Sequence, residues 1–524
     1  MFFSITSLRF ILENYSKLIK SSTKPEKLEE ELRKEIQDAQ SFDEFLDLVS
    51  QLDVLLNNEE WRSNPVSNLY DYKLIQQRLE QFHNDINGLE EIKDLLRTGM
   101  LRNFAGIHNP KLFSRSFSGT KHLIEKYLDK LVSIMYTIAD MPPSVKRNWS
   151  LKHKLDFFAE LKQTFGQTAL ILDGGASFGL YHIGVVKVLI ENDLLPKIIC
   201  GASVGALIAA LVCIHTDEDL PEIFIPGGIS LEAFAQKSAK HGLRRKFTRL
   251  LKYGYLLDIK VIEDCVRSNV GDITFEEAYN KTKRVLNITV SSSKKNEIPK
   301  VLNHLTAPKV LIWSACCASV AVFGLYSSID LLAKDKIGNI VPWNSSTISW
   351  SDTYYDAERA ETRISELFNV NHFITSQAST ATNSFVTPLL STIIPDGLNE
   401  TGITTKISNL ISQEIKHRIN QLSYLGVIPK QISSLFESLS GNSSSNVLIQ
   451  PHIVLKDTMT IFSSPTHSSL DYWTKKGEQS TSRTKLEYTF DEKEQEKVER
   501  IEKLSRKKSM ENFKGKIKRT GSLV

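Results

Sequence analysis

The feature that most constrains the fold is a glycine–serine turn at residues 201–205, with the sequence Gly-Ala-Ser-Val-Gly. The apolar run before it, 197–200, predicts a short buried strand, and the apolar residues after it predict a helix. A strand, a tight turn with two glycines and a helix together form a nucleophile elbow, which exposes the central side chain at a helix N-terminus. Ser203 is therefore a candidate nucleophile, and Gly201 and Gly205 leave room for the turn.

A second glycine-rich loop lies upstream, at residues 173–179 (DGGASFG). It follows a strand-like run at 168–172 and precedes a helix-like stretch at 180–190, so the two loops belong to one βαβ unit. Its bare N–H groups suit an anion, either a dinucleotide pyrophosphate or the oxyanion of acyl transfer. A dinucleotide site needs an acidic residue after the second strand, where this chain has Ser203, and no Gly-Lys-Ser/Thr marks a P-loop. The pattern favours an oxyanion.

The whole stretch 172–206 (LDGGASFGLYHIGVVKVLIENDLLPKIICGASVGA) resembles the patatin-like phospholipase domain, in the branch of fungal and plant triacylglycerol lipases. Four further segments also resemble this branch: 70–79, 95–113, 306–319 and 363–377. The first two resemble the accessory domain that precedes the patatin-like domain in these lipases. The resemblance covers residues 40–390. It implies an α/β fold: a patatin-like three-layer α/β/α catalytic domain with a helical N-terminal domain.

The resemblance also implies a catalytic Ser–Asp dyad. In this branch the aspartate lies eleven residues before the arginine of an Arg-hydrophobic-Ser-Glu segment, which is Arg363 here, so Asp352 is the expected base. Asp356 is the alternate. Thr353 stands at the position after the aspartate where glycine is expected, and threonine adopts a positive φ only with strain. This departure leaves the strength of catalysis open.

The oxyanion hole of the family maps onto the amides of Gly174, Gly175 and Ala176, helped by the amide of Val204. Ala176 stands where the family has glycine, but a hole built from backbone N–H groups tolerates alanine if φ stays negative. The expected reaction is attack by the Ser203 hydroxyl on an ester carbonyl, followed by hydrolysis of the acyl-enzyme. The resemblance implies no cofactor and no metal.

Other functions remain open. A Ser…Asp…His hydrolase would use one of three histidines as base. These candidates are His372, His417 and His452. The loop begins with Asp-Gly-Gly and not with the His-Gly-Gly of such hydrolases, so we favour the dyad. Phospholipase activity, lysophospholipid acyltransferase activity (His452 and Asp457 form a His-x4-Asp) and a catalytically weak scaffold on lipid droplets are further alternatives.

Composition indicates an intracellular protein. The five cysteines show no disulfide or metal-ligand spacing and lie mostly in apolar runs, so buried, reduced thiols are expected. The N-terminal segment does not have the pattern of a signal peptide. The uncharged run 310–329 is long enough to span a bilayer, but its serine, alanine and cysteine content favours buried core.

Two segments favour contact with a lipid surface over contact with nucleic acid. Residues 1–19 carry an apolar stripe at helical spacing, typical of an interfacial helix. The tail 501–524 has eight Lys/Arg against two Glu, which suits anionic lipid. Ser509 and Ser522 follow basic residues and resemble kinase sites, where a phosphate would reduce the tail's charge. We expect peripheral attachment to a lipid droplet or membrane on its cytoplasmic side.

Changes of pattern along the chain predict four regions. They are a helical accessory domain (1–160), a patatin-like catalytic domain (166–390), a helical or irregular extension (391–490) and a charged, basic tail (491–524).

Overall fold

The structure of the chain is a computed structural model. The residues that the structure describes are 28–29, 31–32, 35–36, 42–84, 89–113, 115–116, 119–142, 149–225, 227–230, 259–292, 300–321, 326, 329–343, 350–351, 357–377, 410, 414–415, 417–419, 421–422, 424–425, 446–451, 457 and 466–481. Those residues form two compact units. The helical unit comprises residues up to Gln167 together with 368–372, and the sheet unit comprises 168–367 and 373–481.

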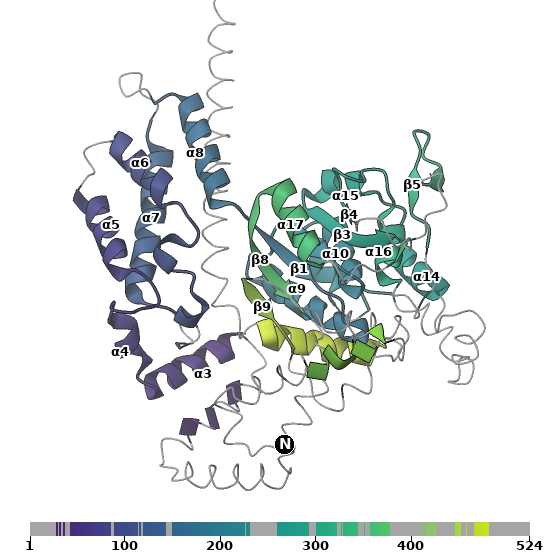
Figure 1. Cartoon of the computed structure of the whole chain (residues 1–524), viewed down its shortest axis with the longest axis horizontal. Coiled ribbons are helices and arrows are strands. Elements are labelled where there is room, and N and C mark those ends of the chain that lie inside the picture. Colours follow the sequence, from purple (N-terminus) through teal and green to yellow (C-terminus); the bar gives the residue numbers. More distant parts are fainter. Residues whose placement is uncertain are drawn as a thin grey trace, which may run out of the picture. The chain divides into compact units, whose positions relative to one another are not determined.

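The helical unit is built from amphipathic helices around one apolar core (Figure 1). Its helices are α3 (Phe42–Leu55), α4 (Asn58–Ser63), α5 (Tyr72–Asn84), α6 (Leu89–Gly99), α7 (His122–Asp140) and α8 (Leu151–Phe165). In this core, the Tyr127 ring stacks with the rings of Phe82 and Phe104. Helix α8 begins where the Ser150 side chain accepts a hydrogen bond from the His153 amide, a typical N-cap.

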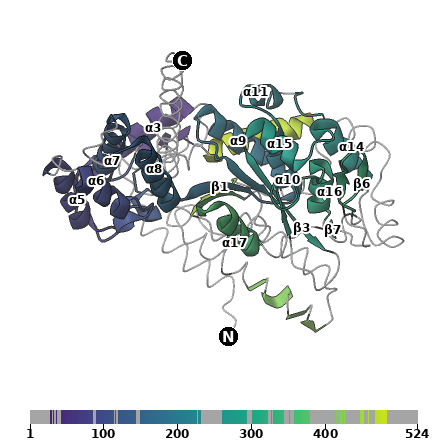
Figure 2. The same ribbon diagram turned by 90° about the horizontal axis from the view of Figure 1, so that it is seen from above.

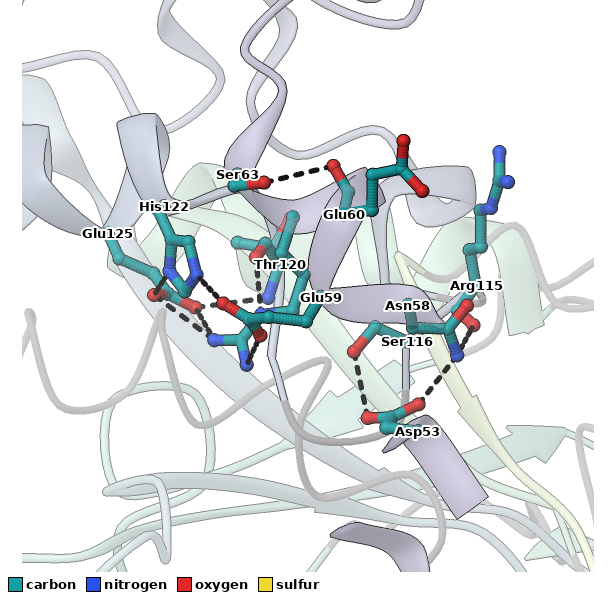
Figure 3. Close-up of polar contacts among 11 residues, drawn as sticks. Asp53, Asn58, Glu59, Glu60, Ser63, Arg115, Ser116, Thr120, His122 and Glu125 are labelled. Carbon is teal, nitrogen blue, oxygen red and sulfur yellow. Dashed lines mark hydrogen bonds and ion pairs between the residues drawn. The ribbon is translucent and has the colours of Figure 1, made fainter. Parts of the chain in front are cut away.

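A polar network joins α4 to α7 on the surface of the helical unit (Figure 3). His122 contacts Glu59 at 2.6 Å through Nε2 and Glu125 at 3.1 Å through Nδ1. Arg62 donates to the same Glu125 carboxylate at 3.0 Å. A neutral imidazole has one N–H, so hydrogen bonds to two carboxylates favour the protonated ring. The two carboxylates accordingly raise the pKa of His122, with the contact to Glu59 as the larger cause.

The sheet unit contains a mostly parallel sheet with the strand order β4-β3-β2-β1-β8-β9, and β7 pairs with β3. Its strands are β1 (Gln167–Leu172), β2 (Ile198–Gly201), β3 (Val285–Ser292), β4 (Lys300–Leu302), β7 (Trp350–Ser351), β8 (Val370–Ser376) and β9 (Val447–Ile449). Strands β1, β2 and β3 are parallel neighbours, and β4 is antiparallel to β3. The β2 side chains are all buried, because a parallel strand is covered on both faces.

Helices cover both faces of this sheet. Helices α9 (Tyr181–Glu191) and α15 (Phe275–Thr282) lie on one side and α17 (Ala357–Phe368) on the other (Figure 2). This arrangement confirms the predicted α/β class. Helix α10 (Val204–Ile214) is almost entirely apolar and buried, because it follows β2 directly into the interior.

The uncharged run 310–329 begins with a short core helix, α16 (Ile312–Val320), whose nine residues are all buried. Residues 310–321 are therefore core, as expected. Among the described residues, no helix is both long enough and apolar enough to cross a membrane. All five cysteines are buried and free, which confirms the expected reduced thiols.

The C-terminal part of the sheet unit lies far from β8 in the sequence. Strand β9 pairs in parallel with β8, and a helix at 467–481 (yellow in Figures 1 and 2) lies on the same side of the sheet as α9. The region that we predicted as an extension thus contributes a strand and a helix to the sheet unit.

Candidate active site

Ser203 occupies the turn between β2 and α10, where it is the N-cap residue of the helix. Its backbone has φ 52° and ψ −125°, a combination that costs a non-glycine residue about 1–3 kcal/mol. Ser203 is buried, with 7% of the residue's surface exposed. A hydroxyl held at the N-terminus of an eleven-residue helix lies where the helix dipole favours negative charge.

The glycines beside Ser203 are required by close backbone contacts. A Cβ atom on Gly205 would lie 2.0 Å from the carbonyl oxygen of Leu172 in β1, and one on Gly201 would lie 2.4 Å from Cα of Ala206. The Ala202 amide also donates to the Leu172 carbonyl at 3.0 Å. The turn is therefore packed directly against the end of β1, and the sequence-based assignment of its glycines has a steric reason.

A contact that sequence reasoning missed holds the turn from α16. The Ser203 amide donates to Oγ of Ser319 at 2.9 Å, and Ser319 is completely buried. The two residues are 116 positions apart in the chain. Ser319 lies in the segment 306–319 that carried the family resemblance, but no local pattern identified this serine.

The glycine loop leaves the end of β1 and enters a short 3-10 helix, η3 (Ala176–Leu180), that leads into α9. The N–H groups of Gly174 and Gly175 find no acceptor among the described residues. Donors without an internal partner are what an oxyanion site needs. Gly179 faces the elbow, since a Cβ atom there would lie 2.6 Å from Cγ1 of Val204.

His182 anchors the loop to the sheet. Its Nε2 atom lies 2.6 Å from the Asp173 carbonyl oxygen, and its Nδ1 lies 2.8 Å from the Ser376 hydroxyl. Since the carbonyl only accepts, Nε2 carries the proton and Nδ1 accepts from Ser376. Burial lowers the pKa of His182 to about 4, consistent with a neutral ring. This agrees with a packing role for His182.

Asp173, the first residue of the loop, is buried as well. Burial, with a smaller effect of the Glu361 carboxylate, raises the pKa of its carboxyl to about 7. The Asp173 amide donates to the carbonyl of Ser376 at 3.0 Å, which ties the loop to β8. The sequence marked this residue only as the start of the loop.

The structure brings part of the predicted site together. The elbow (Gly201, Ser203, Val204 and Gly205) and the glycine loop lie in one βαβ unit of the sheet unit, with Gly179 against Val204. Asp352, Thr353 and Asp356 lie outside the described residues. So do the N-terminal stripe 1–19 and all residues from 482 onward, which include the basic tail with Ser509 and Ser522.

Of the alternative bases, His372 lies in the first part of β8, residues 370–372, which belongs to the helical unit, and its ring contacts that of His108. His417 is exposed and contacts Gln421, and His452 lies outside the described residues. Asp457 is bound by Lys476 and Tyr472, at 2.6 and 2.9 Å. Within the described ranges, no group of histidine, cysteine or acidic side chains is arranged to hold a metal ion.

A serine in a strained strand-to-helix turn of a parallel sheet defines the class of nucleophile-elbow hydrolases. Comparison with known proteins identifies the family within that class. Residues 170–357 match the patatin-like phospholipase family model, and residues 22–163 match a domain of unknown function, DUF3336.

Similar proteins include "Triacylglycerol lipase ptl1" of Schizosaccharomyces pombe, 33% identical over 85% of this chain and 80% of its own length. "Triacylglycerol lipase 5" of Saccharomyces cerevisiae is 34% identical over 80% of this chain and 59% of its own length. "Triacylglycerol lipase SDP1L" of Arabidopsis thaliana is 33% identical over 82% of this chain and 53% of its own length. The chain thus spans four fifths of the first relative and little more than half of the other two.

The chain belongs to the patatin-like phospholipase family, and it is a carboxylic ester hydrolase of that family. The resemblance seen in the glycine loop and the elbow is confirmed, including the accessory domain at the N-terminal side.

Proposed function

We propose that this protein is a triacylglycerol lipase that uses Ser203 as its nucleophile. The observation that carries the proposal is the backbone of Ser203, strained at φ 52° and ψ −125° between β2 and α10. Strain of this kind is kept where function requires it. The substrate class is supported by the relatives named above, each of which carries the name triacylglycerol lipase.

In the proposed mechanism, Asp352 accepts the proton of the Ser203 hydroxyl while the oxygen attacks the ester carbonyl. The amides of Gly174, Gly175 and Ala176, with that of Val204, donate to the oxyanion. Collapse of the tetrahedral intermediate breaks the bond to the leaving oxygen, which takes the proton back from Asp352 and departs as an alcohol, a diacylglycerol when the substrate is triacylglycerol, and leaves an acyl-Ser203 ester. Water, activated by Asp352, then attacks this ester and releases the fatty acid.

The test of the nucleophile compares wild-type protein with Ser203→Ala on a radiolabelled triolein emulsion and on phospholipid vesicles. We expect the alanine variant to lose hydrolysis on both and to lose labelling by a fluorophosphonate probe, with an unchanged melting temperature. Hydrolysis near the wild-type rate would remove Ser203 from the mechanism. Faster hydrolysis of the vesicles than of triolein would replace the lipase proposal with a phospholipase.

The base is tested by a pair of matched variants. Asp352→Asn should lower kcat by orders of magnitude because an amide cannot accept the serine proton, whereas Asp356→Asn should have a small effect. A reversed order would move the role to Asp356. If neither variant affects turnover, a histidine base or a weakly catalytic droplet scaffold becomes the better explanation.

We also propose peripheral attachment to lipid droplets through the stripe 1–19 and the basic tail, with Ser509 and Ser522 as sites where phosphate weakens attachment. Each Lys or Arg near an anionic surface contributes about 1 kcal/mol, and salt screens it. Deletion of 491–524 should therefore weaken droplet flotation, more so at low salt, and further deletion of residues 1–20 should release most of the protein. Retention of the doubly truncated chain on droplets would refute this attachment.

A further inference from the structure

Helix 467–481 lies in direct backbone contact with α9, far outside the segment 170–357 that matches the family model. A Cβ atom on Gly184 of α9 would lie 1.9 Å from the carbonyl oxygen of Thr474. A Cβ atom on Gly477 would lie 2.3 Å from the carbonyl oxygen of Tyr181 and 2.9 Å from Cα of Gly184. Only a glycine on each helix permits this approach.

One side chain of this helix reaches the glycine loop. The Trp473 ring packs on the ring of Phe178, with centroids 4.7 Å apart, and the two residues are 2% and 0% exposed. Phe178 lies in η3, three residues after Gly175, and its amide donates to the carbonyl of Gly175 at 3.0 Å. A displacement of the Phe178 ring therefore acts on the backbone that carries Gly174 and Gly175.

Ionic and polar contacts fix the helix around this tryptophan. Glu478 pairs with Lys187 of α9 at 2.6 Å, across 291 positions of the chain. Lys476 donates to Asp457 at 2.6 Å, and the Tyr472 hydroxyl donates to the other carboxylate oxygen of Asp457 at 2.9 Å. The helix is thus held from both α9 and residue 457, and its register relative to the loop is defined.

We propose that helix 467–481 is a buttress for the oxyanion loop, with Trp473 and Gly477 as positioning residues for the hydrolytic reaction. The proposal rests on the function proposed above. The loop start is tied to β8 through Asp173 and His182, and the helix holds the end of the loop at Phe178. Oxyanion stabilisation depends on donors that are already in place, so a loop held at both ends is what such a site requires.

The first test replaces Trp473 with alanine, which removes the ring from Phe178, and with phenylalanine, which keeps an aromatic contact. Lys475→Ala, on the exposed side of the same helix, is the matched control. Loss of one oxyanion donor lowers kcat about 10²–10³-fold, so we expect at least about a tenfold loss of kcat in Trp473→Ala, with KM little changed. Trp473→Phe should keep most of the wild-type kcat, and Lys475→Ala should have the same kcat as wild type.

The second test, Gly477→Ala, separates positioning from helix stability. Alanine favours a helix over glycine, so helix 467–481 itself becomes intrinsically more stable. The added methyl group nevertheless forces the helix away from α9, and kcat should fall as in Trp473→Ala. Hydrogen exchange of the peptide covering residues 173–180 should rise in both variants and stay at the wild-type rate in Lys475→Ala.

The outcomes distinguish the two proposals. If Ser203→Ala abolishes hydrolysis but Trp473→Ala and Gly477→Ala keep the kcat of the control, the buttress is refuted and the lipase mechanism stands. If Ser203→Ala has no effect, the proposed mechanism fails, and hydrogen exchange at 173–180 alone decides the buttress. Unchanged exchange in both helix variants would overturn it.

Discussion

Replacement of Ser319 by alanine should weaken both the stability of the sheet unit and its catalysis. Ser319 Oγ accepts the amide of Ser203 at 2.9 Å, and both residues are buried. Alanine leaves this buried amide without its partner. The strained backbone of Ser203 then loses one of the contacts that hold it.

The magnitude follows from the chemistry of the lost contact. A buried donor left without an acceptor costs about 1–3 kcal/mol of unfolding free energy. For a unit of about 150–250 residues, this corresponds to a fall of about 2–12 °C in the melting temperature. Turnover should fall about tenfold or more, because a displacement of about 1 Å in a reacting group has effects up to 10²-fold.

A matched control lies on the same helix. Ser314 is also completely buried in α16, and its Oγ accepts the amide of Leu332 at 3.2 Å. Ser314→Ala therefore removes the same group and leaves the partly buried Leu332 amide without this acceptor, but away from Ser203. We expect similar melting temperatures for the two variants by differential scanning fluorimetry, with loss of kcat on a p-nitrophenyl ester in Ser319→Ala only.

Two results would contradict this reasoning. Equal kcat in the two variants would show that the hydrogen bond from Ser203 stabilises the fold without positioning the nucleophile. A melting temperature for Ser319→Ala at the wild-type value would show that the Ser203 amide finds another partner.

Three pH-dependent predictions follow from buried or paired groups, the first two checked by calorimetry between about pH 4 and pH 8 on the full chain and the third by hydrogen exchange. Because the pKa of Asp173 is raised to about 7, its carboxyl contributes a loss of stability as pH rises from about 4 through 7, at most on the order of 4 kcal/mol, and Asp173→Asn should lack this contribution. The pKa of His182 is lowered to about 4, so stability is lost as pH falls from 6.5 towards 4, and His182→Gln should remove that acid sensitivity. The Asp173 and His182 effects oppose each other in wild type between about pH 4 and 6.5, so the stability of each single variant should depend more on pH there than that of wild type. A stability that does not change with pH in either variant would contradict both assignments. Because the pKa of His122 is raised, its protonated ring stabilises the α4–α7 contact below pH 6.5, and this stabilisation is lost as pH rises through the folded-state pKa. Since 43% of the His122 side chain is exposed, the loss should stay below about 1 kcal/mol. It should be seen as faster hydrogen exchange in α4 at high pH, and His122→Gln should lack this pH dependence.

Much of the sheet unit was predictable from local pattern. The strand-like run 168–172 is β1, and the elbow strand and its following helix are β2 and α10, within a residue or two. These assignments succeed because each depends on neighbours in the sequence: apolar runs for buried strands, and glycines where backbone approaches backbone. The close approach of Gly205 to the Leu172 carbonyl in the structure explains why the sequence has glycine at position 205.

Contacts between distant segments were not predictable. Helix 467–481 has an ordinary amphipathic sequence, and nothing in it indicates that Gly477 meets Gly184 or that Trp473 meets Phe178. The extension was therefore expected only to be helical or irregular.

The sequence alone determined the nucleophile turn, the glycine loop and the family, because a strained turn needs glycines at its own positions and so leaves a local mark. The tertiary structure decided what holds the turn and the loop in place. Ser319 is one serine in an apolar run, and His182 is one histidine on a helix, until folding brings them to partners 116 and 194 positions away. A hydrogen bond across such a separation depends on the packing of the whole unit, and it has no periodicity or spacing by which a sequence could reveal it.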